Sequence, residues 1–171
     1  MHPEQPSTLN RIAELKRKIA DAFKGVPAPA HDRIALHECD ECTELRDAFA
    51  GKDWRSMDCE FLEAYFSRLS LLSPEALPYY LPAYLLCALD NFDPDNMVAE
   101  FTIYHLSPEE RIAQSHAEWW REQLRFLTAE QMAVVGEFMQ LVREHEGFRV
   151  YLGDVGPKHE QFREHWTNRW L

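Results

Sequence analysis

Residues 77–89 read LPYYLPAYLLCAL, a stretch that is apolar on almost every side of a helix. A helix without a polar face is buried, so this stretch predicts the centre of the core. Pro78 and Pro82 have no amide donor and are expected to break or kink the helix. The sequence SPE at 73–75 is typical of a helix start, because proline in the first turn loses no hydrogen bond and a carboxylate there suits the helix dipole.

The segments around this centre have the spacing of amphipathic helices. Apolar residues recur three or four positions apart in the segments 9–23, 45–49, 58–72, 128–142 and 162–170. Ser7 is a suitable N-cap for the first segment, Thr128 with Gln131 matches a capping box for the segment 128–142, and Gly51 can end the segment 45–49. The basic residues of the first helix are interleaved with acids and are interpreted as a solvated face. Residues 97–106, MVAEFTIYHL, suit a helix or a strand and are predicted as a helix, and the segment 107–124 opens with another SPE. We therefore expect a mainly α fold, a single-domain irregular bundle of about six to eight helices with a proline-broken central helix.

The length and composition fit one globular domain. The chain has 171 residues, of which 46% are hydrophobic and 27% are charged. A chain of this length buries a substantial core without disulfides or a structural metal. We expect one helical domain over residues 1–171, with residues 1–6 as a flexible N-terminus.

The charge of the chain excludes several classes of partner. Its formal net charge is −11 at pH 7, whereas binding to nucleic acid or to anionic lipid needs an excess of Lys and Arg. The first residues, MHPEQPSTLN, lack the features of a signal peptide, and no segment approaches 18 unbroken apolar residues. We expect a cytoplasmic protein that binds neither nucleic acid nor membrane, and whose partner is a basic or neutral protein.

The one cluster that suggests chemistry is His37-x-Cys39-x-x-Cys42. The two thiolates of a CxxC sequence can approach one zinc ion, and the imidazole of His37 can supply a third ligand. Cys59 or His31 would supply the fourth. The predicted metal site is therefore His37, Cys39, Cys42 and Cys59, with zinc as a structural rather than catalytic cofactor. A second tight ligand pair, which structural zinc fingers usually have, is missing from the sequence.

Two other interpretations of this cluster stay open. Cys39 and Cys42 can be small buried apolar residues near a helix start, with His37 hydrogen-bonded beside them. They can also be a redox dithiol, but the strand-helix-strand pattern that usually carries one is absent, and the acids at 38, 40, 41 and 44 disfavour thiolates unless a helix N-terminus or a cation offsets them. Without a signal peptide, all four cysteines are expected to be thiols or metal ligands.

No motif for nucleophilic or nucleotide chemistry is present. The sequence contains no GxSxG, Walker loop or GxGxxG, and its six glycines are scattered. The acids Asp90, Asp93 and Asp95 lack the glycine and glutamate positions of a calcium loop, so we interpret them as turn and cap residues. No catalytic residue is predicted.

Two segments carry a resemblance to a known family. Residues 37–54, HECDECTELRDAFAGKDW, and residues 69–89, LSLLSPEALPYYLPAYLLCAL, resemble bacterial proteins of the DUF6714 type, whose function is unknown. The resemblance covers about residues 37–127, implies bacterial origin and adds no site residues. The leading hypothesis is a non-catalytic protein-binding module of the immunity or regulatory type, and the alternative is the zinc-binding protein described above.

Overall fold

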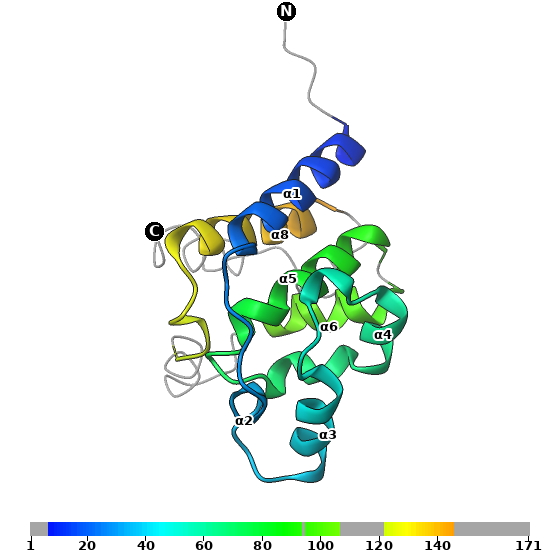
Figure 1. The fold of residues 1–171 in the computed structure, drawn as a ribbon. Coiled ribbons are helices and arrows are strands. Elements are labelled where there is room, and N and C mark those ends of the chain that lie inside the picture. The colour runs from blue at the N-terminus through cyan, green and yellow to red at the C-terminus, as the bar shows by residue number, and fades with distance from the viewer. Residues whose placement is uncertain (1–6, 94, 107–121, 146–171) are drawn as a thin grey trace, which may run out of the picture.

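The structure is a computed structural model and describes residues 7–93, 95–106 and 122–145. It is mainly α-helical, as predicted, and these residues contain no strand. The helices are α1 (Thr8–Phe23), α2 (His31–Ile34), α3 (Asp40–Phe49), α4 (Cys59–Ala64), α5 (Leu77–Asp90), α6 (Met97–Leu106) and α8 (Ala129–Glu144), with the 3₁₀ helices η1 (Trp54–Ser56) and η2 (Phe66–Leu71) (Figure 1).

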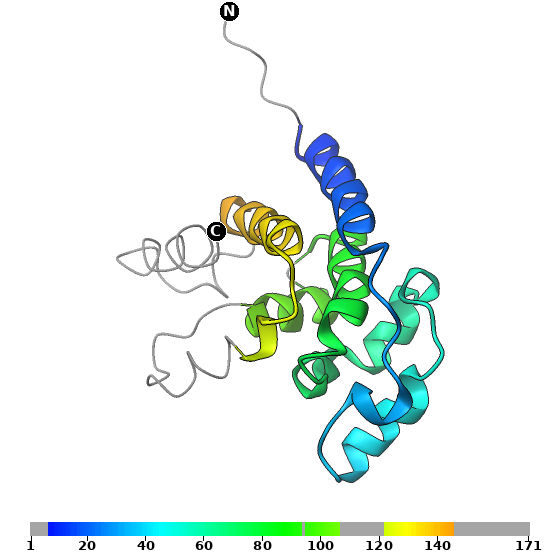
Figure 2. The same cartoon turned by 60° about the vertical axis from the view of Figure 1, so that its left-hand side comes forward.

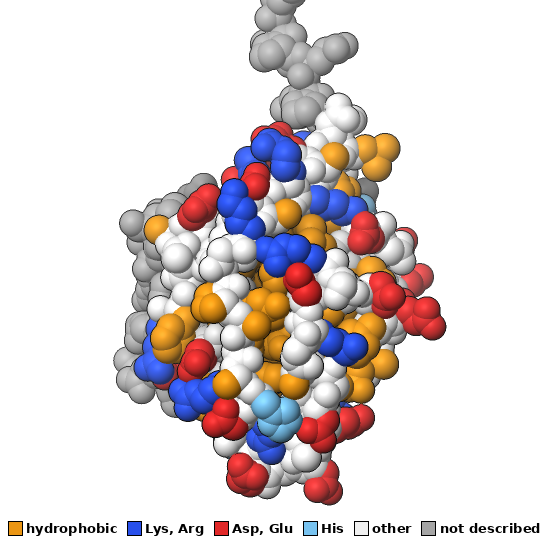
Figure 3. Space-filling model, viewed as in Figure 1, with side chains coloured by type: hydrophobic (Ala, Val, Ile, Leu, Met, Phe, Trp, Pro, Cys, Tyr) orange, Lys and Arg blue, Asp and Glu red, His pale blue; other side chains and the backbone are white. Residues whose placement is uncertain are grey.

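The longest of the described helices, α1 and α8, pack against each other, and α1 also lies across α5 (Figure 2). Both begin at the predicted caps, since Ser7 accepts a hydrogen bond from the Asn10 amide, and Thr128 and Gln131 form a capping box. The basic face of α1 is half-exposed to exposed, and three of its side chains form ion pairs: Arg11 with Glu144, Lys16 with Asp90, and Lys18 with Glu137. Figure 3 shows basic and acidic side chains mixed along α1, which agrees with a solvated face.

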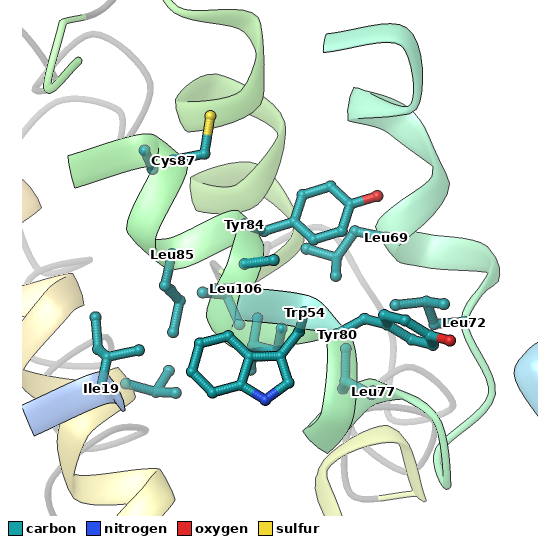
Figure 4. Close-up of a cluster of buried hydrophobic side chains, with 14 of the residues drawn as sticks. Ile19, Trp54, Leu69, Leu72, Leu77, Tyr80, Tyr84, Leu85, Cys87 and Leu106 are labelled. Atoms are coloured by element: carbon teal, nitrogen blue, oxygen red, sulfur yellow. The ribbon is translucent and has the colours of Figure 1, made fainter. Parts of the chain in front are cut away.

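The apolar stretch predicted as the core is helix α5, and every residue of it except Leu86 and Asp90 is buried. Tyr80, Tyr84 and Leu85 point from α5 into the cluster drawn in Figure 4, where Trp54 and Ile19 also lie. α5 packs against α1, α4, α6 and η1, so these helices share one hydrophobic core. That residues 1–171 form a single domain stays a prediction.

The prolines do not break α5, and this corrects the prediction of a broken central helix. Pro78 lies in the first turn, where an amide is not needed, and Pro82 lies inside a helix that continues to Asp90. Pro82 therefore costs a single backbone hydrogen bond, the one its nitrogen would have donated to the Pro78 carbonyl. Ser73 caps the turn at residues 74–76 that leads into α5, because its Oγ accepts a hydrogen bond from the Ala76 amide at 3.0 Å.

Helices α2 and α3 form one end of the molecule (Figures 1 and 2). Cys42, Leu45, Arg46 and Phe49 form the buried face of α3. Phe49 anchors this helix, because its ring contacts the rings of Phe61, Tyr65 and Tyr80 with centroids 5.1–5.5 Å apart. The helix ends at Phe49, and the predicted terminator Gly51 follows the C-cap with a φ of 73°, a conformation that favours glycine.

The segment 97–106 is helix α6, so the prediction of a helix there is confirmed. The helix expected to open at residue 107 and the one expected over 162–170 fall mainly or wholly outside the described residues. Within the ranges that the structure describes, no helix is long and apolar enough to cross a membrane.

Candidate functional site

The predicted Cys/His cluster lies where the chain enters α3. Cys39 is the N-cap residue, and its Sγ accepts a hydrogen bond from the backbone N–H of Cys42 at 3.4 Å. Asp40 and Glu41 occupy the first turn, where carboxylates interact favourably with the helix dipole. The segment thus folds as a capped helix start whose capping atom is a sulfur.

Cys39 and Cys42 are both free thiols, but their surroundings differ. Cys39 is exposed, whereas Cys42 belongs to the buried face of α3 with no accessible surface. Burial raises the pKa of the Cys42 thiol, and its hydrogen bond to Cys39 and the charge of a Cys39 thiolate raise it further. A hydrogen bond from the His37 amide and the charge of the Arg46 guanidinium lower the pKa of Cys42, but by less. The inner cysteine is therefore held as a thiol beside the outer one.

Arg46 fixes the loop that carries this site. The residue is 8% exposed, and its Nη1 donates to the carbonyl oxygens of Ala35 and His37, each at 3.0 Å. Nη2 donates to Thr43 Oγ1 at 3.0 Å. A buried guanidinium is stable only when its donors are satisfied, and these bonds join the loop to the helix.

Arg68 of η2 supplies a second cation at the start of α3. Its Nη1 lies 2.6 Å from Glu41 Oε1, and its Nη2 lies 3.6 Å from Glu44 Oε2. The hydrogen bond that Arg68 donates to Glu41 is the largest cause that raises the pKa of Arg68, and the charge of Cys39 is a smaller one. The acids expected to oppose a thiolate are thus partly neutralised. The sequence could not show this, because Arg68 is distant in the chain.

The other predicted ligands do not join the two thiols. The His37 carbonyl accepts from Arg46 while its side chain is exposed, and the His31 ring lies 2.8 Å from Asp47 Oδ1. Cys59 forms a disulfide with Cys87, with Cα atoms 5.3 Å apart. Among the described residues no group of three or more His, Cys, Asp or Glu side chains is placed to hold a metal ion.

The expectation that all four cysteines are thiols or ligands is therefore wrong for Cys59 and Cys87. Zinc at His37, Cys39, Cys42 and Cys59 stays a prediction, and it would require this disulfide to be reduced. The pairing could not be inferred from spacing, because it depends on how α4 packs against α5. Of the predicted set, the structure brings together Cys39 and Cys42, with the His37 backbone beside them.

The solvent side of the same helix is acidic. We call the exposed residues Glu38, Asp40, Glu41, Glu44 and Asp47 the α3 acidic surface. Their positions follow from the amphipathic pattern, because they alternate with the buried positions that face α2 and the core. Figure 3 shows acidic side chains around the lower end of the molecule, where α3 lies.

Comparison with known proteins finds one family. The model of a family described as "Family of unknown function (DUF6714)" matches residues 11–170. No curated protein and no solved structure matches the chain.

Proposed function

The chain belongs to the family of unknown function DUF6714, and we propose that it is a non-catalytic module that binds a basic protein through the α3 acidic surface. The observation that carries this proposal is the exposure of five carboxylates on one short segment of a chain whose net charge is −11. Such a surface attracts a basic partner during diffusion and fixes its orientation by charge complementarity.

The backbone that carries the α3 acidic surface is anchored at both ends. Arg46 holds the loop that carries Glu38, and Phe49 anchors the other end of α3 in the aromatic cluster. A rigid surface loses little conformational entropy when it binds, so more of the interaction energy contributes to affinity. Leu36, which is 53% exposed, lies next to the acidic residues in the chain and offers an apolar contact.

The carboxylates are available to a partner although some have partners within the chain. Glu41 and Glu44 pair with the half-buried Arg68, and Asp47 bonds to His31, while all three carboxylates are exposed. Exposed ion pairs contribute about 0–1 kcal/mol, so lysines or arginines of a partner can replace them. The Asp40 side chain makes no hydrogen bond or ion pair with any residue that the structure describes.

The finer parts of the proposal are its type and location. We place the protein with immunity or regulatory modules of bacteria and expect it in the cytoplasm. The Cys59–Cys87 disulfide argues against a cytoplasmic location, because stable disulfides persist in oxidising compartments and are rare in the cytoplasm. Fractionation of the native host followed by immunoblotting tests the location directly.

Affinity capture tests the binding function. The bait is the full chain, used beside a variant in which Glu38, Asp40 and Glu44 are replaced by lysine. A matched control replaces Glu60, Glu63 and Glu130, which are exposed acids on α4 and α8, so that both variants change the net charge equally. A basic protein retained by the wild type and the control but lost by the surface variant supports the proposal. Capture of no stable partner from the native lysate, or equal capture by both variants, contradicts it.

A further inference from the structure

We propose that Cys39 and Cys42 are a redox-active dithiol that exchanges with a disulfide of a protein or a low-molecular-weight thiol compound. Cys39 is the attacking thiol and Cys42 the resolving thiol. This activity is separate from the proposed binding of a basic protein and does not depend on it.

The first support is the unequal exposure of the two sulfurs. An attacking thiol must reach its substrate, and Cys39 is exposed at the N-cap of a ten-residue helix. A resolving thiol must be close to the first sulfur and shielded from competing disulfides, and Cys42 is buried one turn further along with its hydrogen bond to Cys39. The Cys42 amide lies 3.4 Å from the Cys39 sulfur, and the two side chains are within hydrogen-bond reach of each other, so the two sulfurs are neighbours at the start of α3.

The second support is that helix stability does not explain a cysteine at this position. The N-cap favours Ser, Thr, Asp or Asn, whose oxygens accept strongly, whereas sulfur is a weak acceptor. A sulfur at the N-cap does gain something else from its position. The Cys42 amide points at it, and the positive end of the helix dipole favours negative charge there.

The third support is the pair of guanidinium groups beside the sulfurs. Arg68 neutralises Glu41 and Glu44 and interacts with the charge of Cys39. Arg46 interacts with Cys42 from the buried side. Both guanidinium groups therefore lie close to the dithiol, and Arg68 pairs with two of its acidic neighbours.

The exchange proceeds in two steps that balance. The Cys39 thiolate attacks one sulfur of a disulfide R–S–S–R′, so that a Cys39–S–R bond forms and R′–S⁻ leaves and takes up a proton. Cys42 then loses its proton and attacks the Cys39 sulfur, which forms the Cys39–Cys42 bond and releases R–S⁻, which is protonated in turn. The two cysteines give up two electrons and two protons, and the substrate disulfide becomes two thiols.

The test uses the full chain, with oxidised glutathione as the probe and intact mass as the readout. The Cys59–Cys87 disulfide is left in place, since an oxidised pair contributes no free thiol to the reaction. After exposure, wild-type protein is expected to lose the mass of two hydrogen atoms and to carry no glutathione. Cys42→Ser is expected to retain one glutathione, and Cys39→Ser is expected to react at least about tenfold more slowly because its remaining thiol is buried.

Three results would overturn the proposal. Wild-type protein that retains glutathione without forming the Cys39–Cys42 bond has no resolving thiol. Wild-type protein that keeps both thiols under these conditions has no redox pair. If folded protein reacts with oxidised glutathione no faster than the same chain unfolded in urea, the fold does not activate these thiols. Circular dichroism of each variant establishes that it is folded, and capture of a basic partner by the double variant Cys39→Ser, Cys42→Ser keeps this outcome separate from the proposed binding function.

Discussion

The hydroxyl of Tyr80 donates a hydrogen bond of 2.9 Å to the carbonyl oxygen of Phe49. Tyr80 lies on the buried central helix α5, and Phe49 lies in the last turn of α3. This bond and the contact between the two rings, whose centroids are 5.1 Å apart, tie the helix that carries the candidate site to the core. The position of the site thus depends on the apolar stretch that determines the fold.

Replacing Tyr80 by phenylalanine is expected to lower the free energy of unfolding by about 1 kcal/mol at pH 7, because a buried carbonyl loses its donor. Burial raises the pKa of Tyr80 to about 12, above its value of 10 in an unfolded chain. The unfolded state therefore releases this proton first, and the contribution of Tyr80 is complete below pH 10 and decreases as the pH rises towards 12. Urea unfolding should show that the free energy of unfolding differs less between Tyr80→Phe and wild type at pH 11 than at pH 7. A larger difference at pH 11 would contradict this role of the Tyr80 hydroxyl.

Stability is expected to fall in acid because of His105. This residue is buried on α6, and burial lowers its pKa to about 4 from an unfolded value of 6.5. The unfolded chain binds the proton first, so the stability is complete above pH 6.5 and is lost as the pH falls towards 4, by about 3 kcal/mol in all. His105→Gln should remove most of this dependence, whereas His31→Gln, an exposed control, should not. Equal pH profiles for wild type and His105→Gln would refute the prediction.

Replacing Arg46 by lysine keeps the charge and removes the planar group that bridges Ala35, His37 and Thr43. We expect a loss of about 2–3 kcal/mol, because buried carbonyls lose their donors. Amide exchange should also become faster over residues 35–39. The control is Arg33→Lys, which changes an exposed pair with Glu75 and should cost less than about 1 kcal/mol. Similar losses of unfolding free energy in the two variants would show that the hydrogen bonds of Arg46 do not hold the loop in place.

The Cys59–Cys87 disulfide joins the start of α4 to the last turns of α5 across 28 positions of the chain. Reduction is expected to lower the free energy of unfolding by about 2–4 kcal/mol, because the unfolded chain gains freedom. The double variant Cys59→Ser, Cys87→Ser should be insensitive to reductant, and Cys39→Ser should respond as the wild type does. A melting temperature of the wild type that does not change with reductant would contradict this.

Metal analysis separates the dithiol from the predicted zinc site. The structure brings two of the four predicted ligands together and holds Cys59 in a disulfide, so protein purified without a histidine tag should contain less than about a tenth of an equivalent of zinc. Stoichiometric zinc that is lost on replacement of Cys39 or Cys42 would instead establish a metal site and remove the redox proposal.

Much of the fold could be predicted from the sequence, because apolar spacing and caps act locally. Ser7, Thr128 and Gly51 lie where their chemistry predicted helix ends, and the apolar stretch at 77–89 is the core. The break at Pro82 was predicted wrongly, since tertiary packing around α5 offsets the loss of one hydrogen bond.

The candidate site was only partly predictable. The CxxC spacing and the acidic neighbours are visible in the sequence, and they suggested zinc and disfavoured a reactive thiol. The cation that changes this balance, Arg68, comes from η2 and meets Glu41 across 27 positions of the chain. The partner of Cys59 was equally distant. Contacts of this kind depend on the packing of helices, which local patterns do not specify.

The central claim is that the α3 acidic surface binds a basic protein. It is tested most directly by calorimetric titration of the purified partner into the wild type, the surface variant (Glu38→Lys, Asp40→Lys, Glu44→Lys) and the control (Glu60→Lys, Glu63→Lys, Glu130→Lys). We predict that the surface variant binds at least about tenfold more weakly while the control stays within about threefold of wild type, and that salt weakens the wild-type complex. Equal affinities for the two variants would contradict the account, because net charge rather than this surface would then determine binding.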